Sequence, residues 1–106
     1  MNKEILKEIG LTDYESDIYI ALLQYGQISA YELAEKIGLY RQATYDALNR
    51  LIEKGFVSSV KEGKSQLYRA ANPELILEYL NEKVENYKQL LPELNKLEKE
   101  SKQPLI

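Results

Sequence analysis

Residues 26–70 decide the fold, and they read GQISAYELAEKIGLYRQATYDALNRLIEKGFVSSVKEGKSQLYRA. Ser29 followed by Glu32 is the pattern of a capping box, which satisfies the free backbone amides at the start of a helix. Gly38 suits the left-handed position that commonly follows the last residue of a helix. The first part of this stretch therefore predicts a short helix that ends in a turn.

The second part of the stretch predicts another helix and a hairpin. A helix is expected over 41–54, closed by Gly55. Two strands, 56–60 and 65–70, then flank the polar, glycine-containing turn 61–64. Two short helices followed by a β-hairpin form the layout of a winged helix-turn-helix, whose second helix enters the major groove of DNA.

The residues before this stretch predict two further helices. Asn2–Ile9 is amphipathic and is ended by Gly10. Thr12 with Glu15 forms a capping box that opens a helix running to Gly26. The apolar residues of that helix are Ile18, Tyr19, Ala21, Leu22 and Leu23.

The C-terminal third predicts a long helix with an apolar seam. Asn72-Pro73-Glu74 combines an N-cap, a proline at the first helical position and an acid at the positive end of the helix dipole. Three- and four-residue steps of the coiled-coil type connect Leu77, Leu80, Val84, Tyr87, Leu91 and Leu94. Pro92 is expected to kink or break this helix, which gives one helix to about Leu91 and a shorter one after it. The tail 103–106 is expected to fray.

These signals predict a mainly α-helical chain with a small β-wing, in two parts. Residues 1–71 form a winged helix-turn-helix domain, and residues 72–106 form a helical dimerisation segment. A chain of 106 residues buries only about 60–70% of its unfolded surface, so a dimer interface would help to stabilise it.

The composition removes most classes of enzyme. The chain has no His and no Cys, and the usual zinc sites, Ser-His-Asp triads and Cys-His dyads need these residues. We therefore expect no catalysis, no metal and no cofactor. Without a signal-peptide-like start or an apolar run of membrane-spanning length, we expect a cytoplasmic, nucleoid-associated protein.

The positive charge is concentrated in one part of the chain. The net charge is −3, but residues 40–70 hold six basic and three acidic side chains, a net charge of +3. That segment holds the second helix of the pair and the hairpin, where phosphates would lie. The charge distribution thus favours binding of nucleic acid over an even, mixed surface.

The second helix divides into a core face and an outward face. At about 100° per residue, the core face holds Thr44, Ala47, Leu48, Leu51 and Ile52. Gln42 and Asn49 on the outward face have amides that can pair with adenine, and Ala43 can contact a thymine methyl group. The predicted DNA-binding residues of this helix are Arg41, Gln42, Ala43, Tyr45, Asp46, Asn49, Arg50 and Lys54.

Within this set, the charged residues have different expected roles. Arg41 can serve a base or a phosphate, whereas Arg50 and Lys54 are better placed for phosphates, which position a protein without reading sequence. Asp46 would be repelled by phosphates, so it either accepts from cytosine or restrains Arg50 at the i+4 position. Tyr45 can reach a phosphate or a base through its hydroxyl.

The hairpin adds three basic side chains. Lys61 and Lys64 straddle Gly63 in a tight turn that suits the DNA backbone, and Arg69 can reach a phosphate from its strand or pair with a neighbour. A solubilising hairpin tip is the alternative interpretation.

Several runs of residues together resemble the TrmB-like family of archaeal winged-helix transcription regulators, a relative of the MarR-like group. The runs are Leu11-Thr12-Asp13-Tyr14-Glu15, Tyr19 with Leu22-Leu23, Ala34 to Gly38, Arg41-Gln42-Ala43-Thr44-Tyr45-Asp46-Ala47-Leu48, Leu51 to Val57, and Tyr68-Arg69-Ala70 with Pro73. The resemblance implies dimeric, sequence-specific binding of DNA and, in longer members, a C-terminal effector domain. Tyr40 stands where such sequences often carry a small or turn-forming residue.

The leading hypothesis is a homodimeric regulator that binds an inverted repeat in double-stranded DNA, with half-sites about 34 Å apart. One alternative is a chromatin-like protein that coats DNA, against which the modest basic surface speaks. Another is a winged helix used as a protein-interaction module without DNA binding, which the overall acidity and the tyrosines permit but the amide-rich helix face does not favour.

Overall fold

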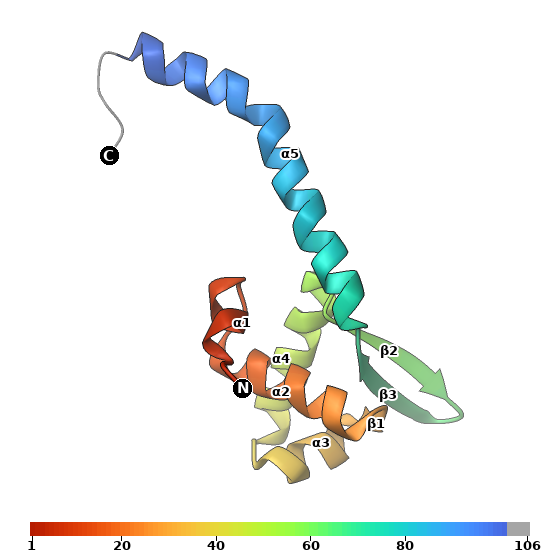
Figure 1. The fold of residues 1–106 in the computed structure, drawn as a ribbon. Helices are drawn as coiled ribbons and strands as arrows, with labels where there is room; N and C mark the ends of the chain where they lie inside the picture. Colours follow the sequence, from red (N-terminus) through yellow and green to blue (C-terminus); the bar gives the residue numbers. More distant parts are fainter. Residues whose placement is uncertain (102–106) are drawn as a thin grey trace. The chain divides into compact units, whose positions relative to one another are not determined.

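The computed structural model describes residues 1–101, and the predicted fraying of 103–106 lies outside them. Contacts divide the chain into two units, Met1–Asn72 and the segment that begins at Pro73. The elements in chain order are α1 (Glu4–Glu8), α2 (Asp13–Tyr25), β1 (Ile28–Ser29), α3 (Ala30–Ile37), α4 (Arg41–Lys54), β2 (Val57–Glu62), β3 (Ser65–Ala70) and α5 (Pro73–Glu100) (Figure 1). The fold class predicted from the sequence, a winged helix-turn-helix with a long C-terminal helix, is confirmed.

The helix starts follow from local hydrogen bonds. The hydroxyl of Thr12 accepts from the amide of Glu15 at 3.2 Å, and the carboxylate of Glu15 accepts from the amide of Thr12 at 3.1 Å, so the predicted capping box is complete. Ser29 makes half of its predicted box: its hydroxyl accepts from the amide of Glu32 at 3.2 Å and donates to the Glu32 carboxylate at 3.3 Å. Gly38 ends α3 in the left-handed conformation, with φ +70°.

The core of the first unit lies where α2, α3 and α4 meet. Ile18 and Leu22 of α2, Leu33 of α3, and Leu48 and Leu51 of α4 are almost fully buried. Burying a side chain of this size contributes about 1.5–3 kcal/mol, so this cluster supplies much of the stability. Leu23, which was predicted to share the apolar face of α2, is 45% exposed, so that part of the prediction is wrong.

An aromatic contact connects this core to the strands. The rings of Tyr19 and Phe56 pack edge to face with their centroids 5.5 Å apart. The Tyr19 hydroxyl donates to the carbonyl of Ala71 at 3.2 Å, and burial raises the pKa of Tyr19 above its usual value. Phe56 thereby joins the end of α4 to the base of the hairpin.

The sheet contains a strand that the sequence pattern did not predict. The two-residue β1 pairs antiparallel with β3, with Ile28 opposite Tyr68, and the strand order is β1-β3-β2. β2 runs to Glu62, which pairs with Ser65, so the turn is two residues shorter than predicted. Gly63, with φ +63°, supplies the left-handed conformation that so tight a turn requires.

The prediction of a helix break near Leu91 is wrong. α5 is one helix of 28 residues with Pro92 inside it. A proline removes one backbone hydrogen bond, but it can kink a helix without ending it. The ribbon of α5 changes direction in its blue, C-terminal part (Figure 1).

In the range 1–101, no helix is both long enough and apolar enough to span a bilayer.

Ser16 on α2 gives a prediction about stability. Its hydroxyl is buried and, within the described part of the chain, has no hydrogen-bond partner. Because a buried polar group without a partner costs free energy, Ser16→Ala is expected to raise the free energy of unfolding by about 1 kcal/mol. Urea denaturation followed by circular dichroism measures the change. Ser59→Ala, an exposed serine on β2, serves as the control, and a less stable Ser16→Ala protein would contradict the prediction.

Candidate nucleic-acid interface

α4 has one buried face and one exposed face. Thr44, Ala47, Leu48 and Leu51 are fully buried, as predicted. Ile52 was also predicted to face the core, but it is 36% exposed, so that prediction is wrong. The residues of α4 that were predicted to contact DNA and are exposed in the structure are Arg41, Gln42, Tyr45, Asp46, Asn49 and Arg50.

The start of α4 projects an aromatic side chain. Tyr40 is the N-cap residue, its side chain makes no capping hydrogen bond, and it is 88% exposed. Its carbonyl accepts from the buried hydroxyl of Thr44 at 3.0 Å, which ties the first turn of the helix together. The guanidinium of Arg41 lies over the ring of Tyr31, 5.3 Å from the ring centroid. Ala43 is half-buried beside them.

The two polar residues one turn apart on the outward face are hydrogen-bonded to each other. Nε2 of Gln42 donates to Oδ1 of Asp46 at 3.0 Å. The alternative in which Asp46 restrains Arg50 is wrong, because the guanidinium of Arg50 donates to Glu15 instead.

Glu15 forms a buried ion-pair cluster with the C-terminal half of α4. Its side chain is 0% exposed, and its two carboxylate oxygens accept from Nε of Arg50 at 2.6 Å and from Nζ of Lys54 at 2.5 Å. Lys54 also donates to the carbonyl of Gly10 at 2.8 Å. The cluster therefore connects α4 to the start of α2 and to the turn before it. The sequence predicted phosphate contacts for Arg50 and Lys54. In the structure both side chains are instead paired with Glu15 of the same chain.

The pKa of Glu15 shows how these contacts balance. Burial raises the pKa of this carboxyl, but the hydrogen bonds from Lys54 and Arg50 outweigh burial, and its pKa lies below the usual value. Glu15 is thus ionised at neutral pH. In the sequence it is visible only as a capping residue, since Arg50 lies 35 positions and Lys54 39 positions away.

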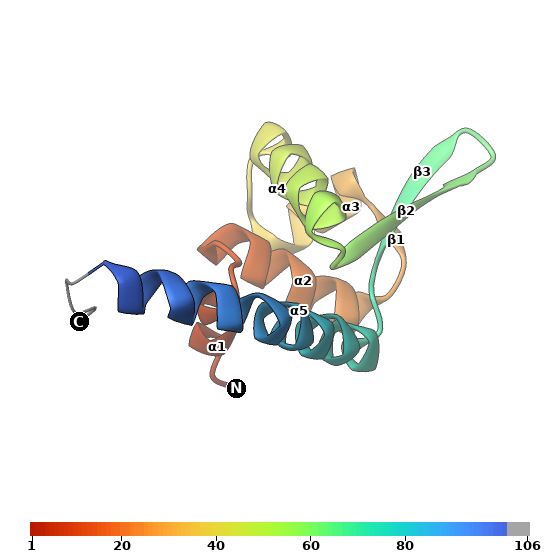
Figure 2. The ribbon, with the colours of Figure 1, turned by 90° about the horizontal axis from the view of Figure 1, so that it is seen from above.

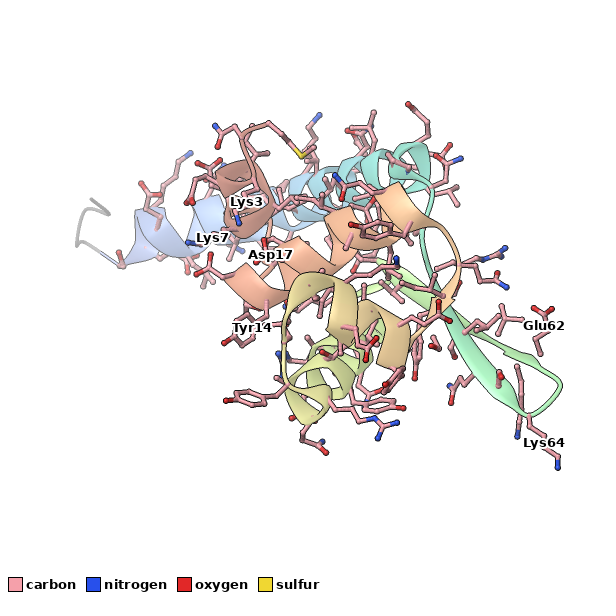
Figure 3. The ribbon with its side chains drawn as sticks, turned by 90° about the horizontal axis from the view of Figure 1, so that it is seen from below. Lys3, Lys7, Tyr14, Asp17, Glu62 and Lys64 are labelled. Carbon is pink, nitrogen blue, oxygen red and sulfur yellow. The ribbon has the colours of Figure 1, made fainter. Side chains whose placement is uncertain are left out.

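The hairpin of β2 and β3 extends away from the helices of the first unit (Figure 2). Lys64 lies at its tip with its side chain directed outward, and Glu62 projects nearby (Figure 3). Lys61 is exposed on β2 and pairs in register with Gln66. Arg69 was predicted to contact a phosphate or to pair with a neighbour. Its Nε donates across the strands to the hydroxyl of Ser58 at 3.4 Å.

The ion pairs of Glu15 reduce the positive charge of this surface. Of the six basic side chains in residues 40–70, Arg50 and Lys54 share the carboxylate of Glu15, which lies outside that segment. Because the single carboxylate of Glu15 offsets only one of these two cations, residues 40–70 counted together with Glu15 carry a net charge of +2. The surface is therefore less basic than the sequence count indicated.

The second unit carries the apolar seam predicted for α5. Leu77, Val84, Tyr87 and Leu91 are 38–60% exposed, and Leu80 and Leu94 are partly buried. A shallow hollow in the C-terminal part is lined by four apolar or aromatic residues, namely Tyr87, Leu91, Leu94 and Leu97, and by the polar residues Asn95, Glu98 and Ser101. A stripe of exposed apolar side chains along a helix is typical of an interaction surface.

No cluster of carboxylate residues in the described chain is arranged to hold a metal ion.

Comparisons with known proteins agree on a family. The family model described as "Sugar-specific transcriptional regulator TrmB" matches residues 6–74. The sugar-sensing transcriptional regulator TrmBL1 of Pyrococcus furiosus is 39% identical over 77% of this chain and 25% of its own length. The DNA-binding transcriptional repressor TrmBL2 of Thermococcus kodakarensis is 36% identical over 97% of this chain and 38% of its own length.

A solved structure has a similar fold. TrmBL2, described as an archaeal chromatin protein with a novel mode of DNA binding, is 30% identical and superimposes with a TM-score of 0.62, over 98% of this chain and 43% of that one. This chain spans a quarter to two-fifths of the length of these curated relatives. The family match covers more than half of the chain, from α1 to the start of α5. This chain belongs to the TrmB family of transcriptional regulators.

Proposed function

We propose that this chain binds double-stranded DNA in a sequence-specific manner as a homodimeric transcription regulator. α4 enters the major groove, and the hairpin tip, residues 61–64, lies along the backbone. The observation that carries the proposal is the exposed polar face of α4, with Gln42, Asp46 and Asn49 outward and the opposite face fully buried. A helix held this firmly by its core face can present base-reading side chains in a fixed geometry.

The low net charge of the interface supports sequence-specific binding. Binding without sequence preference depends almost entirely on phosphate contacts, which need an excess of basic side chains. With a net charge of only +2 over residues 40–70 once the carboxylate of Glu15 is counted with them, contacts to bases have to supply more of the affinity. In the cell this function places the protein on the nucleoid, in the cytoplasm.

The second candidate function is coating of DNA without sequence preference, because the relative TrmBL2 is described as a chromatin protein. Selection from a random duplex pool at low and near-physiological salt distinguishes the two. An enriched inverted repeat with half-sites about one helical turn apart supports the dimeric regulator. Binding without enrichment that disappears as salt rises supports coating, and no binding at either salt supports a protein-interaction module.

Lys64→Ala is expected to weaken binding to all duplexes alike and to make the slope of log K against log salt shallower by about 0.9. Lys64 lies at the hairpin tip with its ammonium group directed outward (Figure 3), as a phosphate contact requires. Fluorescence anisotropy over a salt series measures the slope. Arg50→Ala is the matched control: its guanidinium is held by Glu15, so its slope should equal that of the wild type. A change of slope in Arg50→Ala alone would contradict this division of roles.

A further inference from the structure

The hydrogen bond between Gln42 and Asp46 changes what α4 offers to a base. A free glutamine side chain presents two N–H donors and one carbonyl acceptor. Here one Nε2–H is already donated to Oδ1 of Asp46 at 3.0 Å. What remains for a ligand is one N–H of Gln42, its carbonyl oxygen and the lone pairs of the Asp46 carboxylate. The pair therefore offers more acceptors than donors.

The nearby basic side chains are directed to other partners. Arg50, four residues after Asp46, is held by the buried carboxylate of Glu15, and Arg41 lies over the ring of Tyr31. The carboxylate of Asp46 is exposed on the outward face of the helix. It therefore presents its charge to any partner that approaches this face.

The base edges of the major groove respond differently to such a pair. Guanine presents two acceptors there, and thymine presents one acceptor and a methyl group, so both are repelled by a carboxylate and a carbonyl. Adenine and cytosine each present an exocyclic amine, which is a donor. A phosphate group is also repelled.

We propose that Gln42 and Asp46 act as one unit that selects, at one position of each half-site, a base with an exocyclic amine in the major groove. This inference rests on the proposed binding of DNA by α4. Gln42 contacts the base, while Asp46 holds the Gln42 amide in place and adds a negative charge that penalises guanine, thymine and a poorly aligned backbone. The Gln42–Asp46 pair thus lowers the overall affinity for DNA and raises the selectivity between bases.

The test begins with selection from a random duplex pool by the full chain and three variants. Asp46→Ala removes both the hydrogen bond and the charge, and is expected to lose the preference for adenine or cytosine and to bind the unselected pool more tightly. Asp46→Asn removes the charge but keeps an acceptor for Gln42, and is expected to retain only part of the preference while also binding the pool more tightly. Glu53→Gln removes an equal charge from an exposed residue of the same helix, and is expected to keep the wild-type motif.

Duplexes of the selected sequence then identify the group that is read. Guanine or thymine at the position is expected to weaken binding of the wild type roughly ten-fold. Removing the amine alone, with purine in place of adenine or 2-pyrimidinone in place of cytosine, is expected to give a similar loss. The same substitutions should have little effect on binding by Asp46→Ala. Thermal unfolding checks that each variant is folded.

The outcomes separate the two proposals. If the wild type binds no duplex even at low salt, the proposed function fails. If the wild type enriches a motif and Asp46→Ala enriches the same motif with the same selectivity, the function stands and the Gln42–Asp46 unit is wrong. A wild type that binds the duplexes without the amine as tightly as the unmodified duplex would also overturn it.

Discussion

Replacing Arg50 and Lys54 together by methionine is expected to lower the free energy of unfolding at pH 7 by about 3–5 kcal/mol. The two substitutions keep the aliphatic stems but remove both cations from the carboxylate of Glu15, which is 0% exposed. A buried charge without a partner is far more costly than the loss of a contact between exposed groups. Urea denaturation of the double variant and the wild type measures the difference.

Glu15→Gln breaks the same ion pairs but is expected to cost less, about 1.5–2 kcal/mol. The side chains of Arg50 and Lys54 are 46% and 35% exposed, so both can return to water when the carboxylate is removed. The amide oxygen of glutamine can still accept from the backbone amide of Thr12 in the capping box. If Glu15→Gln were as unstable as the double variant, burial of an unpaired charge would not be the cause.

The pH dependence provides an independent check. In the wild type the pKa of Glu15 is lowered from 4.5, so its contribution to stability is complete above that pH and is lost as the pH falls through the folded-state pKa. In the double variant both cations are gone, so burial is the dominant effect on Glu15. Burial raises the pKa of this carboxyl and makes its ionised form unfavourable at neutral pH. The deficit of the double variant relative to the wild type should therefore shrink as the pH is lowered from 7 towards the unfolded-state value. A deficit that is constant with pH would contradict this account.

Introducing lysine at Val84 and Leu91 is expected to weaken self-association at least a hundred-fold. Both side chains belong to the exposed apolar seam of α5, and a charge at a core position of a paired helix has to be desolvated without a counterion. Analytical ultracentrifugation at micromolar concentrations should show a dimer for the wild type and a monomer for the variant. Gln89→Lys, which adds a positive charge to an exposed residue of α5 between the two seam positions, is the control and should remain dimeric.

The same pair of substitutions should reduce affinity for the selected inverted repeat by about 10²–10⁴-fold, because each half-site is then bound without the other. Affinity for a single half-site should change little, since the substituted residues lie in the second unit and α4 in the first. A wild-type protein that is monomeric at micromolar concentration would reject the proposed dimer, whatever its affinity for DNA.

The amino-acid sequence alone determined the features that depend on neighbouring residues. Thr12 and Glu15 satisfy each other's amides within one turn, and Gly38 and Gly55 end their helices in the left-handed conformation. These effects act over three or four residues, so a local pattern is enough to predict them. For the same reason the core face of α4 was predictable from its helical period, apart from Ile52 at its edge.

Only the tertiary structure decided what depends on distant partners. The sequence shows that Arg50 and Lys54 are basic and outside the core face, but not that a carboxylate more than thirty residues earlier is buried between them. β1 is two residues long and exists only because β3 lies beside it. Pro92 marks a lost hydrogen bond, and whether the helix bends or ends there depends on the flanking turns. The net charge of the proposed interface is therefore determined by tertiary packing. A salt bridge forms where the folded chain brings two charged groups together, and their spacing in the sequence does not reveal it.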